Sequence, residues 1–365
     1  MKILTLFFTY GTSLEDWSKN GSLDREINIY KKFLNYFDKI YFITYGMNDL
    51  RYASKLPENI IILPKKIATN NFLYSLLIPI LYRKEITEST WLKTNQMLGS
   101  WTAVLAKLFF RKKFALRTGY TESLSVVGKN FFRKKLIAFI ELLAYKSANF
   151  SIVTSIHQKD YVAKKYNITN IHVIPNGIDT EIFKPLEKKD ASTKTKLLFV
   201  GRLHPEKNLL NLIAAIKDLK NTKLTIIGKG ELKNDILALK GKFSLDLEII
   251  ESVPNSELPK IYNDADIYIQ PSLYEGNPKT ILEAMSCGLP VIATDVSGIN
   301  TIINHKKNGY LCKIDTPSII NAILEVVNNI ALRKSIGIAA RKYIENNYAI
   351  DQIINNEINS YKKYL

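Results

Sequence analysis

Two glutamates in the second half of the chain have the residue type and spacing that suit a ligand rich in hydroxyls. Glu275 and Glu283 have seven residues between them. Carboxylates are poor ligands for phosphate but good acceptors for the hydroxyls of ribose and sugar rings. The two side chains therefore indicate a site for a hydroxyl-rich molecule, and any phosphate on that molecule must be held by other groups.

A strand, a loop and a helix must position the two glutamates. The run 267–270 has the apolar character of a buried strand, and the loop 271–277 follows it. Pro278 has the fixed φ that suits a first helical turn, and Gly288 suits the position just past the helix end. Open α/β sheets bind ligands at the carboxyl ends of their strands, where N–H groups at a helix N-terminus hold phosphate. We therefore expect the loop to form part of a ligand site.

Short apolar runs alternate with longer amphipathic ones along the chain, which predicts the α/β class, with parallel sheets and helices on both faces. The predicted strands of the first series are 2–8, 39–44, 60–63, 91–94, 113–117, 150–154 and 172–174. Those of the second series are 196–200, 223–227, 246–250, 267–270, 290–293 and 310–312. Two series of strands indicate two Rossmann-like domains.

A polar, turn-rich segment separates the two series. It begins at Pro175 and reads PNGIDTEIFKPLEKKDASTK. We predict a first Rossmann-like domain over 1–175, an interdomain linker over 176–195 and a second Rossmann-like domain over 196–345. The polar helical tail 346–365 is a candidate for packing back on the first domain.

Charge is distributed unevenly over the chain, whose formal net charge is +17. Residues 1–150 hold 23 Lys and Arg against 11 Asp and Glu, whereas residues 151–365 hold 28 against 23. Basic residues beside phenylalanines, as around residues 107–146, suit an anionic membrane surface or nucleic acid. A third possibility is solvated lysines from a compositional bias, because lysines make up 42 of the 51 basic residues. We expect a membrane surface and no nucleic acid.

Composition restricts the class of protein and its location. With 46% hydrophobic and 23% charged residues, the chain is an ordinary globular protein and not a disordered one. Two cysteines are too few for a disulfide framework, which favours a reducing compartment. The longest apolar run is too short for a membrane span, and the first residues read as a strand and not as a signal peptide. We predict a cytoplasmic protein, peripheral on the inner face of the plasma membrane.

The segment QPSLYEGNPKTILEAMSCGLPVIAT, residues 270–294, resembles the signature of the GT-B retaining glycosyltransferases, specifically family 4 (group 1). Three other segments support the resemblance. HVIPNGIDTEIFKP, residues 172–185, is similar to the interdomain linker of the family. FVGRLHPEKNLLNLIAAI (199–216) and IIGKGEL (226–232) are similar to the start of its donor domain. The resemblance implies a GT-B fold, in which an acceptor-binding and a donor-binding Rossmann-like domain face a central cleft.

The resemblance also implies roles for individual residues. Arg202 and Lys207 would hold the diphosphate of a nucleotide-sugar donor, Glu275 would contact the transferred sugar, and Glu283 would accept from the ribose. Catalysis would rest on Glu275, Arg202 and Lys207. The remaining donor-binding candidates are Val253, near the base, with Gly276, Asn277, Pro278, Lys279 and Thr280, near the sugar and phosphates.

In the first domain the family places glycines in the loop after the first strand and a histidine near the reacting sugar. Gly21 is our candidate for the glycine, within the segment 13–26 that we expect to be this loop. The histidine is absent, because the corresponding segment reads ALRTGYTES. Arg117 and Tyr120 take its place as acceptor-side candidates.

The resemblance implies a metal-independent, retaining glycosyltransferase without a cofactor, since the nucleoside-diphosphate sugar is a substrate. The formal Asp264-Ala265-Asp266 motif is expected to be structural, and no metal site is predicted. UDP is the expected nucleotide. The expected acceptor is a lipid-linked or other saccharide in bacterial surface polysaccharide synthesis, such as lipopolysaccharide or capsule. The alternatives are a GT-B nucleotide-sugar epimerase and a non-catalytic protein that binds membrane or nucleic acid.

Overall fold

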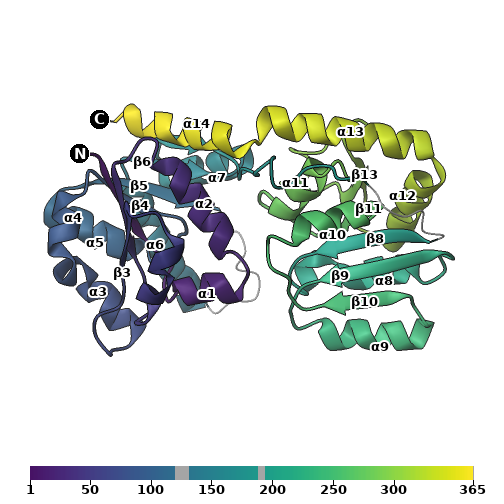
Figure 1. The fold of residues 1–365 in the computed structure, drawn as a ribbon, viewed down its shortest axis with the longest axis horizontal. Helices are drawn as coiled ribbons and strands as arrows, with labels where there is room; N and C mark the ends of the chain where they lie inside the picture. Colours follow the sequence, from purple (N-terminus) through teal and green to yellow (C-terminus); the bar gives the residue numbers. More distant parts are fainter. Residues whose placement is uncertain (120–130, 188–193, 365) are drawn as a thin grey trace. The chain divides into compact units, whose positions relative to one another are not determined.

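The computed structural model describes residues 1–119, 131–187 and 194–364 (Figure 1). These residues form two compact units. The first unit consists of residues 1–175 and the C-terminal residues 353–365, and the second of residues 176–352. Each unit is a layered α/β structure with its own hydrophobic core.

The first unit is built on a seven-stranded sheet in the order β3-β2-β1-β4-β5-β6-β7, with all pairs parallel. Its strands are β1 Ile3–Phe7, β2 Lys39–Ile43, β3 Ile60–Leu63, β4 Trp91–Thr94, β5 Lys113–Thr118, β6 Phe150–Val153 and β7 Ile171–Val173. The central strands are buried almost throughout, because helices cover both faces of a parallel sheet.

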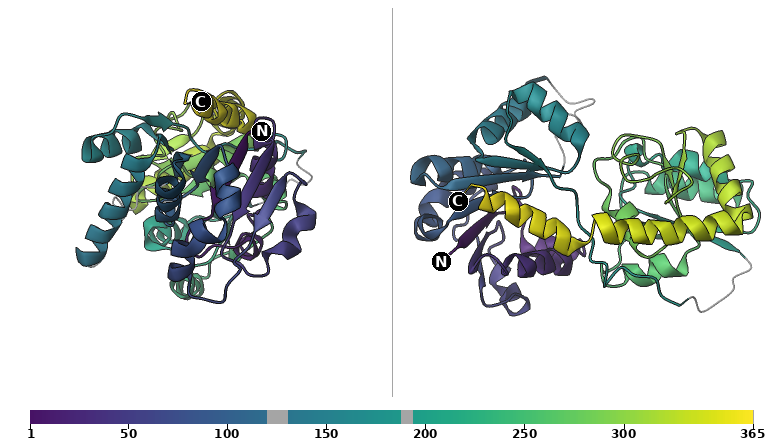
Figure 2. Two further views of the ribbon diagram at one scale, coloured as in Figure 1. Left: turned by 90° about the vertical axis from the view of Figure 1, so that its left-hand side faces the viewer. Right: turned by 90° about the horizontal axis from the view of Figure 1, so that it is seen from above.

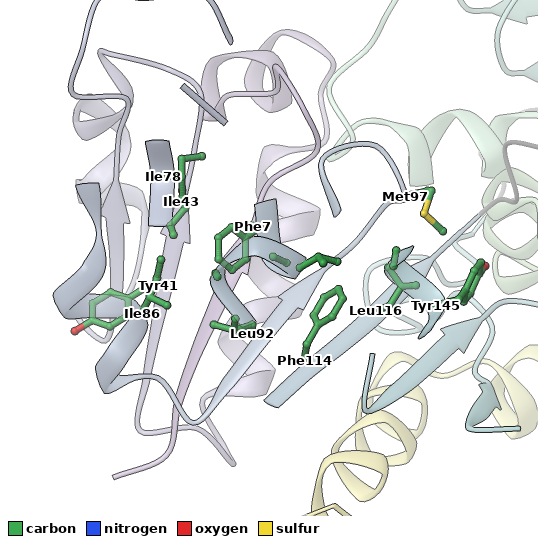
Figure 3. Close-up of a cluster of buried hydrophobic side chains, with 14 of the residues drawn as sticks. Phe7, Tyr41, Ile43, Ile78, Ile86, Leu92, Met97, Phe114, Leu116 and Tyr145 are labelled. Atoms are coloured by element: carbon green, nitrogen blue, oxygen red, sulfur yellow. The ribbon is translucent and has the colours of Figure 1, made fainter. Parts of the chain in front are cut away.

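Helices flank this sheet (Figure 1). They are α1 Leu14–Lys19, α2 Leu23–Phe33, α3 Asn71–Leu81, α4 Arg83–Glu88, α5 Ser100–Phe110, α6 Phe131–Ser147, α7 Ile156–Tyr166 and, for the most part, α14 Ile350–Lys362, with a 3-10 helix at Asp49–Lys55. Phe7, Leu92, Phe114 and Leu116 lie in the core between the sheet and one helical layer (Figure 3). Views from two further sides show α14 lying along the first unit (Figure 2).

The second unit is built on a six-stranded parallel sheet in the order β10-β9-β8-β11-β12-β13. Its strands are β8 Thr195–Val200, β9 Thr222–Ile227, β10 Leu247–Ile250, β11 Ile267–Gln270, β12 Val291–Thr294 and β13 Tyr310–Cys312. Its helices are α8 Leu209–Ile216, α9 Lys233–Phe243, α10 Leu258–Asp264, α11 Lys279–Ser286, α12 Thr316–Asn328 and α13 Ile330–Asn347, with a 3-10 helix at Pro205–Lys207.

Both sheets have a topological switch point, at which the strand order reverses. In the first sheet it lies between β1 and β4, and in the second between β8 and β11. Ligands of open α/β sheets bind beyond the carboxyl ends of the strands at such a point. In the second sheet these ends lead into the loops 201–208 and 271–278, so topology brings together the two segments that carry the predicted cations and Glu275.

The expected linker packs in the second unit, and most of the C-terminal helix α14 packs in the first unit. Ile178 and Phe183 of the expected linker are buried in the core of the second unit. Ile178 also forms a bridge with Ala349. At the other end, Glu357 of α14 forms buried ion pairs with Lys93 and Arg117 of the first sheet.

The loop after the first strand differs from the expectation. Residues 13–26 were expected to form it, but α1 and most of the first turn of α2 occupy this segment. Ser13 and Asp16 form a capping box that starts α1, so the true loop spans only residues 8–13. Gly21 has a φ of 68° in the turn between α1 and α2. The glycine that lies in the loop after β1 is Gly11, with a φ of 76°.

Candidate active site

The two loops at the second switch point are cross-linked by three contacts. The Leu273 N–H donates to the Glu206 carbonyl at 2.8 Å. The Tyr274 hydroxyl donates to Glu206 Oε2 at 2.8 Å. Lys207 Nζ lies 2.6 Å from Glu275 Oε1. The predicted cation and the predicted carboxylate are therefore direct partners.

One oxygen of Glu275 is fully engaged by neighbouring groups. Its Oε1 accepts from Lys207 Nζ at 2.6 Å, from Gln270 Nε2 at 2.7 Å and from Ser272 Oγ at 2.7 Å. The side chain is 11% exposed. No hydrogen bond to Oε2 is found in the described part of the chain, so this oxygen is available to accept a ligand hydroxyl. On this carboxylate, the neighbouring side chains therefore hold one oxygen, and the other oxygen can accept from a ligand.

Gln270 links Glu275 to the strand and to the helix that follows. It is 1% exposed at the end of β11. Its carbonyl oxygen accepts from the Tyr268 hydroxyl at 2.5 Å and from Thr280 Oγ1 at 3.4 Å, while its amide donates to Glu275. Its amide also donates to Ser272 Oγ at 2.9 Å. Because an amide both donates and accepts, Gln270 can satisfy all four neighbours at once.

Arg202 is held less tightly than Lys207. Its side chain is 75% exposed, and its guanidinium lies 2.7 Å from Glu206 Oε1. Burial alone would raise the pKa of Glu206, but the hydrogen bond from Tyr274 and the two nearby cations lower it below its ordinary value. Glu206 is thus an anion that contacts both Arg202 and Tyr274, and an exposed arginine beside it can move to a phosphate.

Glycines allow the loops of the site to pack backbone against backbone. A Cβ on Gly228 would lie 1.8 Å from the Gly201 carbonyl oxygen, and one on Gly230 would lie 2.3 Å from that of Leu203. The GKG turn therefore supports the loop that carries Arg202. Gly298, with a φ of 84°, lies equally close to the other loop, because its Cβ would be 2.2 Å from the Glu275 carbonyl oxygen.

The helix α11 begins beside Glu275. Pro278 is its N-cap, one position earlier than expected, and makes no side-chain hydrogen bond to the first turn. Lys279 and Thr280 follow in that turn, so α11 directs its N-terminus to the ligand edge of the sheet. Glu283 lies one turn further on and is 2% exposed. It accepts from the Tyr262 hydroxyl at 2.9 Å, and its role toward a ribose stays a prediction.

Asn277 is held by the segment that begins the second unit. The Asn176 N–H donates to Asn277 Oδ1 at 2.8 Å, and Asn176 Nδ2 donates to the Asn277 carbonyl at 2.8 Å. These two hydrogen bonds, both donated by Asn176, join the PNGID segment to the loop that contains Glu275 and Gly276. Val253, the expected neighbour of the base, is partly buried after the carboxyl end of β10.

The first-unit candidates do not join this cluster. Gly21 closes the turn between α1 and α2, as described above. Arg117 pairs with Glu357 at 2.7 Å and donates to the Pro175 carbonyl at 3.2 Å, so it ties α14 to the sheet. Its acceptor role stays a prediction. Tyr120 lies outside the described residues.

Four positioning residues escaped the sequence analysis, namely Glu206, Gln270, Asn176 and Gly298. Signals for three of them were present, since Glu206 stands between the two cations, Asn176 lies in the PNGID segment and Gln270 opens the signature segment. Gly298 carried no comparable signal. Its importance rests on the packing of the 295–298 turn under Glu275, which only the tertiary structure shows.

The Asp264-Ala265-Asp266 segment has a structural role. It spans the end of α10 and the approach to β11, and Asp266 accepts from the Lys196 N–H at 2.9 Å. Within residues 1–119, 131–187 and 194–364, no group of three His, Cys, Asp or Glu side chains could hold a metal ion.

Comparison with known proteins places the second unit in a family. Residues 179–343 match the family described as "Glycosyl transferases group 1". A curated relative, the UDP-Gal:alpha-D-GlcNAc-diphosphoundecaprenol alpha-1,3-galactosyltransferase of Escherichia coli, is 32% identical over 219 residues. The alignment covers 54% of this chain and 56% of that protein, so the chain spans little more than half the length of this relative.

Solved structures extend the similarity to both units. A sucrose-phosphate synthase from Thermosynechococcus elongatus aligns with a TM-score of 0.82 at 17% identity, covering 100% of this chain and 99% of that one. Alr3699/HepE of Anabaena, solved in complex with UDP-glucose, aligns with a TM-score of 0.79 at 17% identity over 100% of both chains. At this level of identity the structures establish the fold alone.

Two Rossmann-like parallel sheets, matched end to end by these structures, define the GT-B fold class, which confirms the predicted fold. The family match then makes the identification more specific. Residues 179–343, which make up most of the second unit, match the group 1 glycosyl transferases directly. The resemblance to this family that the motifs of the second unit carry is confirmed.

Proposed function

We propose that this protein is a retaining glycosyltransferase that moves a sugar from a UDP-sugar to a lipid-linked or other saccharide acceptor in bacterial surface polysaccharide synthesis. The observation that carries the proposal is the contact between Lys207 and Glu275 at the second switch point. It unites a cation suited to phosphate with a carboxylate that presents one oxygen to a hydroxyl. The name of the E. coli relative, with UDP-Gal and a diphosphoundecaprenol, supports the choice of nucleotide and acceptor.

In this proposal the residues of the second unit bind the donor. Lys207 and Arg202 hold the diphosphate, and Oε2 of Glu275 accepts from a hydroxyl of the transferred sugar. Gly276, Asn277, Pro278, Lys279 and Thr280 line the sugar and phosphates, Glu283 serves the ribose, and Val253 lies near the base. For Glu283 to reach the ribose, the hydrogen bond from Tyr262 must be shared or exchanged.

Catalysis then rests on positioning and electrostatics. Breaking the glycosidic bond leaves a nucleoside diphosphate, and fixed cations stabilise the charge that accumulates on it in the transition state. The acceptor hydroxyl attacks the same face of the sugar, its proton passes to the departing phosphate, and the anomeric configuration is retained. No cofactor takes part in this scheme.

The acceptor half of the proposal rests on the charge of the first half of the chain. Residues 1–150 carry a net charge of +12, from 23 basic and 11 acidic residues. A basic surface is attracted to anionic lipids, and this would concentrate the enzyme where lipid-linked saccharides are found. No helix in the described ranges is long and apolar enough to cross a membrane.

The first test is a calorimetric titration with UDP-, GDP-, ADP- and dTDP-sugars. We expect one nucleotide class to bind the wild type, and Lys207→Met and Glu275→Gln to weaken that binding. The matched control is Lys233→Met, which removes a lysine of the same unit that pairs with Glu251 on the surface. Binding of no donor, or equal loss in the control, would refute the donor site.

The second test follows the reaction. Purified protein, the donor identified above and a lipid-linked saccharide should give a product whose new linkage has the donor's anomeric configuration by NMR. Inversion would contradict the retaining mechanism. Conversion of the donor with no acceptor present would indicate an epimerase, and binding to nucleic acid or membrane without any donor binding or transfer would indicate a non-catalytic protein.

A further inference from the structure

Helix α3 lies on the protein surface although it has no charged residue. Its outward stripe consists of Phe72, Leu76 and Ile80, which are 60%, 38% and 66% exposed. The opposite side, with Tyr74 and Ile78, is buried in the core. A helix that is apolar on all sides is normally enclosed, so the outward face of α3 lacks a cover within the described chain.

Helix α6 also exposes large apolar side chains, and in addition it buries its acidic residue. Leu136, Phe139 and Leu143 form its outward stripe and are 59%, 56% and 41% exposed. Its one acidic residue, Glu141, is 0% exposed and accepts from the Tyr166 hydroxyl. An ordinary surface helix turns its charges outward and its leucines inward. Here the one carboxylate points inward, while leucine and phenylalanine face outward beside the exposed Lys135 and Lys146.

Helix α5 joins these two helices into one surface. It packs against both α3 and α6, and Leu108 and Phe109 at its end are 65% and 61% exposed. We call the exposed large apolar side chains of the three helices the apolar face. Its members are Phe72, Leu73, Leu76, Ile80, Leu108, Phe109, Leu136, Phe139, Leu142 and Leu143.

The second unit has no comparable surface. Among its described helices none carries more than two exposed large apolar side chains, whereas α3 and α6 carry four each. Singly exposed apolar residues are normal on soluble proteins, but a contiguous apolar patch marks an interaction site.

Charge identifies the occupant of the apolar face. Residues 100–147 contain ten Lys and Arg but only two Asp and Glu, and one of these two is the buried Glu141. The occupant must therefore be anionic as well as apolar. The members of the apolar face are Leu, Ile and Phe, without the Trp and Tyr that are enriched at protein–protein contacts. A fluid lipid bilayer can accept apolar side chains without such residues.

We propose that the apolar face inserts into the interfacial region of an anionic bilayer, with α3 and α6 lying in the membrane plane. The basic residues around the helices would then meet the lipid headgroups, as in in-plane amphipathic helices. This goes beyond attraction of a basic domain, because it assigns most of the binding energy to buried apolar side chains. It does not depend on the proposed reaction.

The test is flotation of the full chain with phosphatidylcholine vesicles, with and without phosphatidylglycerol, in the absence of donor and acceptor. We expect binding to the anionic vesicles. The double variant Phe139→Ser/Leu143→Ser should lower the partition coefficient at least about tenfold, since it removes two large inserted side chains. Ile338→Ser, which removes a 73% exposed side chain from α13, is the matched control and should change it less than about twofold.

Two further measurements distinguish insertion from purely electrostatic binding at the membrane surface. A tryptophan at Phe139→Trp should shift its emission to the blue on anionic vesicles, and Ile338→Trp should not. Moderate salt should weaken the binding only in part, because apolar insertion is not screened. Circular dichroism and nucleotide titration of each variant check that the fold and the donor site are intact.

Three results would overturn the proposal. One is failure to bind vesicles of either composition. Another is binding that salt abolishes and that the double variant leaves unchanged. The third is a concentration-dependent dimer that the double variant dissociates, without vesicle binding, which would make the apolar face a contact between two copies. Because no donor or acceptor is used, each result is independent of the proposed reaction.

Discussion

The two switch points of this protein have the same topology, but the loops of one carry charged side chains and those of the other do not. In the second unit the loops 201–208 and 271–278 hold two cations and two carboxylates in direct contact. In the first unit the equivalent loops 8–13 and 95–99 contain no charged residue. Backbone contacts hold these loops together, such as the Tyr10 N–H donating to the Leu98 carbonyl at 3.1 Å.

A glycine allows this close approach in the first unit. Gly99 has a φ of 95°, and a Cβ there would lie 2.9 Å from the Tyr10 nitrogen. The charged residues of the first sheet serve elsewhere, in the buried contacts among Lys93, Arg117 and Glu357. Strand order thus offers each unit an edge for a ligand, and the side chains decide which edge can bind an anion.

The strongest test of this contrast is Glu357→Gln, which removes the anion shared by two buried cations. Lys93 and Glu357 are 2% and 4% exposed and lie 2.6 Å apart. Leaving buried cations unpaired costs about 3–5 kcal/mol. We expect this loss in denaturant unfolding followed by tryptophan fluorescence, because Trp17, Trp91 and Trp101 all lie in the first unit.

The control for Glu357→Gln is Glu15→Gln, which changes a carboxylate of the same unit. Glu15 pairs with Arg51 at 2.7 Å but is 39% exposed, so its loss should lower the free energy of unfolding far less than the loss of Glu357. Equal losses of unfolding free energy in the two variants would show that the buried ion pairs stabilise the first unit no more than an exposed pair does.

Acid should weaken the first unit through the same residue. Burial alone would raise the pKa of Glu357, but Lys93 and Arg117 outweigh it and hold the pKa below its ordinary value. A carboxyl with a depressed pKa stabilises the fold at pH values above its unfolded pKa, about 4.3. This stability is lost as the pH falls through the lower, folded pKa. Glu357→Gln should flatten that part of the curve of unfolding free energy against pH.

Lys207→Met should have the largest effect on activity. It removes the cation next to Glu275 and the proposed phosphate contact, and loss of one such group costs about 10²–10³ in kcat. Thr12→Val changes the uncharged loop of the first switch point and should leave nucleotide affinity unchanged. Calorimetry and transfer rates measure both, and weaker nucleotide binding by Thr12→Val would contradict the contrast between the two switch points.

Two substitutions of Gln270 test how much its hydrogen bond to Oε1 of Glu275 contributes, apart from its other contacts. Gln270→Met removes every hydrogen bond of this side chain, whereas Gln270→Glu keeps the acceptor for Tyr268 and Thr280 but not the donor to Glu275. A hydrogen bond to a charged group contributes about 1.5–3 kcal/mol, so each variant should lose about 10–100-fold in kcat/KM.

The relevant readout for Gln270 is the difference in affinity between UDP-sugar and UDP. If Gln270 positions Glu275 for the sugar, that difference should shrink while the affinity for UDP itself persists. A parallel loss of both affinities would mean that Gln270 only stabilises the fold.

The smallest effect is expected for Asn176→Ala. Its two hydrogen bonds to Asn277, each 2.8 Å, are neutral and contribute about 1 kcal/mol apiece. Donor affinity should fall several-fold at most, with thermal stability nearly unchanged. A loss as large as that of Lys207→Met would place Asn176 among the residues that contact the donor.

The sequence was informative about the second unit because its motifs are local. Lys207 lies close to β8, and Glu275 and α11 lie close to β11, so the sequence placed each motif at a strand end, and the resemblance to the family implied one common site. It was less informative about the first unit. The expected loop 13–26 is largely helical, because the Ser13–Asp16 capping box starts α1 directly after the short loop 8–13.

By itself the sequence determined the α/β class, the two strand series and the loops that carry Arg202, Lys207 and Glu275, because periodicity, glycines and charges act over a few residues. Only the tertiary structure decided which groups meet. Lys93 and Glu357 are 264 residues apart in the chain, and Lys207 and Glu275 are 68 apart. The physical reason is that contacts across a sheet depend on strand order, which no local pattern specifies.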